Sequence, residues 1–234
     1  MNKWVDFSLG VTDTPSAAPK PPLPHRPEMD WWGFCLGARM NRTILFADDA
    51  NVYHGARRAF FSDADPRTSG GYDPSKMASL IVNRTAPYLA ARELSEVRVY
   101  TGRPDPTRNP TGAAEHDRKA QAWSQAGAIV IARPLRYLNG KAQQKGVDVA
   151  MAIDIVTMAI DGKYDVGLVA STDTDLKPAL EYVIKACPKA HVEVIGWRAA
   201  SYQQRLYIAG VKLWCHWLER GDYDAVADPR DYRT

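Results

Sequence analysis

The sequence predicts an α/β domain with a mostly parallel central sheet that is flanked by helices. Short runs of aliphatic and β-branched residues alternate with stretches of helical periodicity, which is typical of βαβ units. The apolar runs are nearly continuous, and this indicates strands that are buried on both faces. At 234 residues, the chain is long enough to build one well-packed core.

The pattern places five clear strands and one weaker strand between helical stretches. We expect strands at 43–47, 96–100, 128–132, 165–170, 191–196 and, with a weaker pattern, 211–217. Helical patterns occupy 75–92, 115–126, 147–161, 175–186 and about 199–207. Crossovers between parallel strands should be right-handed.

The first 39 residues differ in composition from the rest of the chain. The stretch "TPSAAPKPPLPHRP" is rich in proline and small residues, so we expect 1–39 to be a disordered Pro-rich extension. A partner-binding tail is the alternative. We expect the folded domain to span 40–222 and a flexible tail to follow at 223–234.

The composition excludes several classes of protein. No apolar run approaches the roughly 20 residues of a membrane helix, and no secretory signal precedes the domain. The three cysteines are far apart and form no CxxC pair, which argues against a disulfide framework or a zinc site. We therefore expect a cytoplasmic protein without a membrane partner. The net charge of +3 is weak support for a polyanionic partner.

Acidic and polar side chains gather where expected strands end and where one expected helix begins. In open parallel sheets, ligands bind outside the carboxyl ends of the strands. The fold could therefore bring these residues together at one edge. The candidate site comprises Asp48, Asp49, Asn51, Asp148, Ser171, Asp173 and Asp175.

Clustered carboxylates repel one another unless a cation is present. Ligand sets made only of oxygen favour Mg²⁺ or Mn²⁺ over zinc. Such an ion would polarise a phosphoryl oxygen and lower the pKa of a bound water, so hydrolysis of a phosphodiester is the natural reaction.

Each of these residues also has a structural interpretation. Asp173 or Asp175 could cap the following helix, and Asp148 could be a first-turn acid favoured by the helix dipole. Asn51 could be a turn residue that bonds its own backbone.

Two further acids have an open role. Asp48 and Asp49 are adjacent, so only one can point the same way from an extended backbone, and we favour Asp48. Asp154 lies about 120° from Asp148 around the expected helix, so it could join the site or face solvent.

Three segments resemble the signature segments of the NYN domain, a PIN-like nuclease family that includes LabA-like proteins. They are "ILFADDANVYHG", "KGVDVAMAIDIVTMA" and "YDVGLVASTDTDLKPALE". The resemblance covers roughly residues 40–196 and implies a three-layer PIN-like (Rossmannoid) fold with Mg²⁺- or Mn²⁺-dependent ribonuclease activity.

The resemblance also assigns roles to particular residues. It implies that Asp48, Asp148 and Asp173 are the metal-site acids, with Asp175 in support, and that Asn51 and Ser171 are polar helpers. One position departs from the pattern, since many members have glycine where this chain has Asp49.

Basic loops next to the acids suit RNA, whose phosphates attract cations and whose unpaired bases stack on aromatic rings. We expect a single-stranded or structured RNA as the partner. The candidate RNA-binding residues are Arg57, Arg58, Arg133, Arg136, Tyr137, Lys141 and Lys145.

Two other functions stay open. One is a non-catalytic RNA-binding or regulatory module on the same fold. The other is a phosphatase with an aspartate nucleophile, although "FADDANV" lacks the Asp-x-Asp-x-Thr pattern of the haloacid dehalogenase group. Methionines and aliphatic residues at helical spacing are expected to form the core or a homodimer face.

Overall fold

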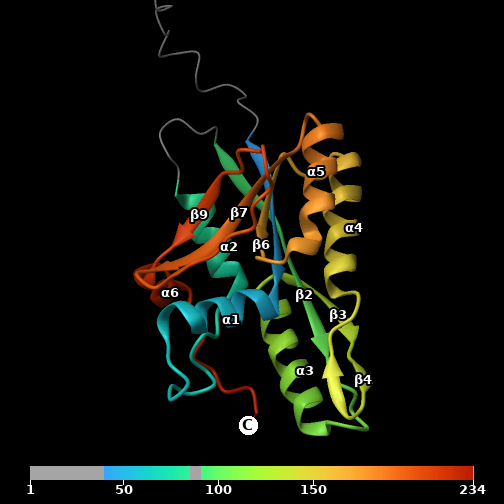
Figure 1. Ribbon diagram of the computed structural model, residues 1–234, viewed down its shortest axis with the longest axis vertical. Helices are drawn as coiled ribbons and strands as arrows, with labels where there is room; N and C mark the ends of the chain where they lie inside the picture. Colours follow the sequence, from blue (N-terminus) through green and yellow to red (C-terminus); the bar gives the residue numbers. More distant parts are fainter. Residues whose placement is uncertain (1–39, 85–90, 234) are drawn as a thin grey trace, which may run out of the picture. The chain divides into compact units, whose positions relative to one another are not determined.

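We analysed a computed structural model of the chain, which describes residues 40–84 and 91–233. The predicted disordered extension at 1–39 lies outside these residues. Figure 1 shows the arrangement of the helices and strands. In chain order they are β1 (Asn41–Asp48), α1 (Asp49–Phe60), α2 (Pro74–Asn83), β2 (Arg92–Arg103), α3 (Pro110–Gln125), β3 (Ala128–Pro134), β4 (Arg136–Leu138), β5 (Lys141–Gln143), α4 (Val147–Ile160), β6 (Val166–Ala170), the 3₁₀ turn η2 (Thr174–Leu176), α5 (Lys177–Ala186), β7 (His191–Ala199), β8 (Tyr202–Gln203), β9 (Cys215–Leu218) and α6 (Arg220–Val226).

The central sheet is mostly parallel, as the sequence predicted. Its strands follow the order β3, β2, β1, β6, β7, and β9 lies on the other side of β7. All these neighbours pair in parallel, and only the short β8 runs antiparallel to β7. Strands β4 and β5 form a separate antiparallel hairpin.

Helices cover both faces of the sheet, and Figure 1 shows α4 and α5 on one side with α1 and α2 on the other. Alternate residues of β1 face the two layers. Leu45 and Ala47 belong to the core beneath α1, α2, α3 and α6. Ile44 and Phe46 belong to the core beneath α4 and α5. The expected three-layer α/β architecture is therefore confirmed.

The apolar residues of helix α4, which were expected to form the core or a homodimer face, divide into a buried group and an exposed group. Met151 and Ile155 are fully buried, as predicted for core residues. Val149, Ile153 and Ile160 are more than half exposed. A homodimer that uses this face stays a prediction.

The predicted helix at about 199–207 is wrong. Residues 202–203 instead form β8, which pairs with Arg198 and Ala199 at the end of β7. Leu206 and Ile208 are both buried, and this spacing of two is that of an extended chain. The expected helix at 75–92 is also too long, since α2 ends at Asn83 and β2 begins at Arg92.

Helices α1 and α6 were not anticipated. Asp48 caps α1, and Val52 and Ala56 place one face of that helix against the sheet. The expected flexible tail from residue 223 is wrong for the described residues, since Tyr223 and Val226 of α6 are buried in the core. Asp228 beyond α6 is also buried, with 6% of its surface exposed.

The strand order creates one position that is suited to binding a ligand. The helices that follow β1 pack on one face of the sheet and those on either side of β6 in the chain pack on the other, so the strand order reverses between β1 and β6. Ala47 of β1 pairs with Ala170 of β6, and the next residues, Asp48 and Ser171, therefore end their strands side by side. In doubly wound sheets, this switch point is where ligands bind. None of the described helices is long and apolar enough to span a bilayer.

Candidate active site

Asp48 is a buried carboxylate at the end of β1, with 6% of its surface exposed. It caps α1: its Oδ1 accepts a hydrogen bond from Asn51 N at 3.1 Å, and its Oδ2 accepts one from Asn51 Nδ2 at 2.7 Å. Burial raises the pKa of Asp48 despite these bonds, and the negative charges of Asp49 and Asp173 raise it further. Burial and the neighbouring negative charges thus destabilise the ionised form of Asp48.

The end of β6 supplies the second acid. Asp173 caps η2, and its Oδ1 accepts a hydrogen bond from Asp175 N at 3.0 Å. The buried Ser171 orients this loop, because its Oγ accepts a bond from Asp173 N at 3.1 Å. The cap predicted for Asp173 or Asp175 therefore belongs to Asp173, and the Asp175 side chain is exposed.

One amide joins the two loops. Asn51 donates to Asp48 and accepts a hydrogen bond from Thr172 Oγ1 at 2.8 Å. This connection places the Asp173 loop against the start of α1. The structure thus brings together Asp48, Asn51, Ser171 and Asp173 from two distant segments, whose connecting residues Asn51 and Thr172 lie 121 positions apart along the chain.

Asp148 lies in the first turn of α4, as the sequence predicted. The helix begins at Val147, directly after Gly146, whose φ of 77° lies in the left-handed region that favours glycine. Among residues 40–84 and 91–233, however, no group of three or more His, Cys, Asp or Glu side chains is arranged to hold a metal ion. Asp48, Asp148 and Asp173 therefore do not form a closed ligand cluster.

The acid pair nevertheless fits a hard divalent cation. Asp48 and Asp173 offer only oxygen atoms, and the repulsion at buried Asp48 would be relieved by a positive charge. Mg²⁺ is commonly held by one or two carboxylates, with water and substrate phosphate as its other ligands. Two carboxylates are thus enough for such an ion.

The other two candidate acids are engaged in ion pairs. Asp49 accepts hydrogen bonds from Lys119 Nζ at 2.9 and 3.1 Å. Asp154 accepts bonds from Arg98 Nη2 at 2.9 Å and from the Tyr100 hydroxyl at 2.7 Å. These bonds give Asp154 a structural explanation, and they mean that a cation already neutralises Asp49.

A cleft of about 530 Å³ opens beside Asp49. Its walls come from α1, α3, the end of β2 and the C-terminal residues 228–233, and Figure 1 shows this last segment returning below α1 toward α3. Arg118 Nε holds the segment by donating to Tyr232 O at 2.6 Å. Sequence reasoning missed both Lys119 and this wall, because neither follows from local spacing.

The candidate RNA-binding residues divide into two groups. Arg57 donates four hydrogen bonds to backbone carbonyls of the loop at 62–69, which gives it a structural role. Tyr137 packs beneath Arg108, whose Cζ lies 5.1 Å from the ring centroid. The remaining candidates have exposed side chains on α1, on the β4–β5 hairpin or beside it: Arg58, Arg133, Arg136, Lys141 and Lys145.

A mostly parallel α/β sheet with a buried acid at its switch point defines the class of open-sheet proteins that bind ligands outside the carboxyl ends of their strands. The chain matches the NYN domain over residues 42–206, and it belongs to this family of PIN-like nucleases. No curated protein matches the chain. A crystal structure of a protein of unknown function, VPA0982 from Vibrio parahaemolyticus RIMD 2210633, resembles it with a TM-score of 0.46 and 18% identity, over 67% of this chain and 82% of that one.

Proposed function

We propose that the protein is a metal-dependent endoribonuclease that hydrolyses RNA phosphodiester bonds at the Asp48–Asp173 pair. The observation that carries this proposal is the buried Asp48 carboxylate, whose pKa is raised by burial and by the nearby charge of Asp173 at the edge where the paired strands β1 and β6 end. A binding site for polyanions has no use for two unneutralised carboxylates, whereas a site for Mg²⁺ or Mn²⁺ requires them.

The side chains divide the work as follows. Asp48 and Asp173 would hold the ion, and a bound ion would polarise a phosphoryl oxygen and lower the pKa of a water. Asn51 fixes the Asp48 carboxylate through Nδ2, and Ser171 fixes the Asp173 backbone. Asp148 and Asp175 are proposed as further acids on the substrate side of the pair.

The RNA would approach across the basic side of this edge. Arg133, Arg136 and Lys141 lie on or next to the β4–β5 hairpin, which precedes α4 and Asp148. Their exposed cations can pair with phosphates without breaking internal bonds. The cleft beside Asp49 adjoins this hairpin, since Gln144 lines it, and it would offer a channel for the RNA.

A non-catalytic RNA-binding module is the second candidate, and one observation favours it. No third acid closes a ligand cluster within the part of the chain that the structure describes, and Lys119 neutralises Asp49. A protein that uses the basic surface alone would bind RNA equally well with or without a divalent ion.

Cleavage of RNA separates these functions. End-labelled RNA is incubated with the full chain in Mg²⁺, Mn²⁺ or EDTA, and a small phosphate ester is tested in parallel. We expect internal cuts with metal, none in EDTA and no ester hydrolysis. Asp48→Asn should abolish cleavage. The control is the same Asp-to-Asn replacement on α4, and Asp154→Asn should cleave RNA at the wild-type rate. Metal-independent binding without cuts would support the second candidate, and ester hydrolysis alone would indicate a phosphatase.

A further inference from the structure

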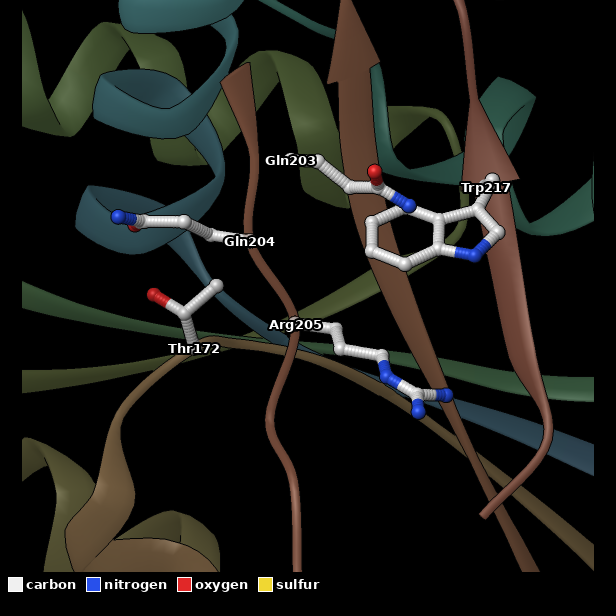
Figure 2. A pocket seen from close by; sticks show the side chains of 5 residues that line it. All are labelled: Thr172, Gln203, Gln204, Arg205 and Trp217. Atoms are coloured by element: carbon white, nitrogen blue, oxygen red, sulfur yellow. The ribbon is translucent and has the colours of Figure 1, made fainter. Parts of the chain in front are cut away.

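A second hollow lies beside Thr172, in the loop that follows β6. It has a volume of about 400 Å³ and is lined by Thr172, Gln203, Gln204, Arg205 and Trp217. Figure 2 shows the Gln203 and Arg205 side chains on the same side of their segment as the Trp217 ring, and Gln204 on the side of Thr172. The hollow thus combines an indole ring, two amides and a guanidinium.

This hollow is connected directly to the acid pair. Thr172 Oγ1 donates to Asn51 Oδ1 at 2.8 Å, and Asn51 Nδ2 donates to Asp48 Oδ2 at 2.7 Å. A ligand that contacts Thr172 would therefore lie within two hydrogen bonds of Asp48. This position suits the part of a substrate that lies next to the bond being cut.

The floor of the hollow is built on a glycine. A Cβ atom at Gly196 would lie 2.6 Å from Gln204 O and 2.9 Å from Trp217 Cζ3. Only glycine in β7 lets the indole ring and the segment after β8 approach the sheet this closely. The position of Trp217 is thus set by backbone packing, while the Gln203 and Arg205 side chains stay exposed.

We propose that this hollow is a subsite for one unpaired nucleobase of a single-stranded RNA. An indole ring provides a stacking surface for any base, and the Gln203 amide, on the same side of the segment as the ring, offers donors and an acceptor to a base edge. The Arg205 guanidinium can pair with the adjoining phosphate. A base inside a duplex cannot stack on a protein ring, so the subsite selects single strands.

The subsite deepens the proposed function and rests on it. It also adds a component that the acids do not require: Trp217 lies beyond the residues that match the NYN domain. The subsite can therefore fail while the nuclease site stands. Binding measured in EDTA separates the two, because it does not depend on cleavage.

The test measures the affinity of the full chain for a fluorescein-labelled ten-nucleotide RNA and for a matched RNA duplex, both in EDTA. Trp217→Leu should weaken single-strand binding about tenfold or more, which is the scale of losing one stacked base. Trp217→Phe keeps a ring and should retain most of the affinity. Trp214→Leu is the control, since Trp214 is exposed nearby and lies outside the hollow.

Two surface changes guard against a variant that fails to fold. Gln203→Ala and Arg205→Met alter exposed side chains. Both should weaken binding, but only Arg205→Met should lower the salt slope, by about one phosphate. A loss with Arg205→Met alone, with Gln203→Ala and Trp217→Leu unchanged, would mean a phosphate contact and would overturn the base subsite.

The remaining outcomes are also decisive. Equal losses for Trp214→Leu and Trp217→Leu, or equal affinity of the wild type for duplex and single strand, would overturn the subsite. If the wild type cleaves RNA and Trp217→Leu binds as tightly as the wild type, the subsite fails and the nuclease stands. If the wild type neither binds nor cleaves RNA, both proposals fail.

Discussion

Two buried carboxylates at opposite ends of the same sheet have opposite electrostatics. Glu193, near the start of β7, is 2% exposed and accepts hydrogen bonds from both terminal nitrogens of Arg92 at 2.8 and 2.7 Å. His216 Nε2 lies 2.6 Å from Glu193 Oε2, the oxygen that also accepts from Arg92 Nη1. At the far end, Asp48 has acids as neighbours and, among the described residues, only the Asn51 amide as a side-chain hydrogen-bond partner.

The pKa values of the two acids shift in opposite directions. Burial alone would raise both, but hydrogen bonds from His191 and His216 and the charge of Arg92 lower the pKa of Glu193 well below its usual range. The pKa of Asp48 is raised. A buried acid whose charge is compensated by the protein stabilises the fold, whereas one whose charge is not compensated is available for an external cation.

The largest effect on stability should come from replacing Glu193, the buried acid whose charge the protein compensates. Glu193→Gln leaves Arg92 and His216 buried without their counter-charge, and the free energy of unfolding should fall by about 3 kcal/mol or more. Urea unfolding at pH 7 measures this. Glu96→Gln is the control, because its ion pair with Arg98 is more exposed. RNA cleavage per folded molecule should not change, and a loss of activity without a loss of stability would contradict the comparison.

The pH dependence of stability should separate the same two sites. Because the folded-state pKa of Glu193 is lowered, its contribution is present above the unfolded pKa of about 4.3 and is lost as the pH falls below it. Because the pKa of Asp48 is raised, its ionisation opposes folding as the pH rises. Melting curves from pH 3 to 7 should therefore be flatter for Glu193→Gln than for the wild type. Asp48→Asn should melt slightly higher than the wild type at pH 7, without metal, and a lower melting temperature would count against repulsion at this site.

Divalent metal should bind at Asp48 and not at Glu193, and this binding should stabilise the folded protein. At 10 to 100 times its dissociation constant, Mg²⁺ or Mn²⁺ should add about 1.4 to 2.7 kcal/mol to the free energy of unfolding. Calorimetry and melting temperature measure the binding. Asp48→Asn should lose the effect and Glu193→Gln should keep it. Equal stabilisation of both variants would place the ion elsewhere.

The smallest effect is expected from the basic hairpin. Replacing Arg133, Arg136 and Lys141 with alanine should weaken RNA binding and reduce the salt slope by about two to three phosphates. The control is a variant with Lys163→Ala and Lys189→Ala. These two lysines precede β6 and β7, at the edge of the sheet opposite the acids, and their removal should leave the salt slope unchanged. An unaltered slope in the hairpin variant would show that RNA binds along another surface.

The acid pair could be predicted because it depends on few long-range facts. Once β1 and β6 are buried parallel strands, Asp48 and Asp173 must lie at the same edge of the sheet. A cap role for Asp173 could also be predicted, since Asp is a common residue at that position, whereas the cap role of Asp48 was missed together with helix α1. The ion pair of Asp49 with Lys119 could not, because it joins residues 70 apart through the orientation of α3.

The irregular parts of the chain were the least predictable. The segment after β7 has polar and apolar residues that fit a helix, yet pairing with Arg198 and Ala199 makes it extended. Without that extended segment there is no hollow at Trp217. The C-terminal residues read as polar, but Asp228 is buried through bonds to Arg230 and Tyr232. Tertiary hydrogen bonds of this kind cannot be predicted from the periodicity of polar and apolar residues in the sequence.

The most direct test of the central claim is the cleavage rate of Asp173→Asn beside its melting temperature and its RNA affinity in EDTA. Asparagine caps a helix nearly as well as aspartate, so the fold should be unaffected. As a metal ligand, Asp173 should be irreplaceable, and cleavage should fall on the order of 10²-fold or more while metal-free RNA binding persists or tightens. Cleavage at the wild-type rate would contradict the metal site and leave Asp173 as the cap of η2.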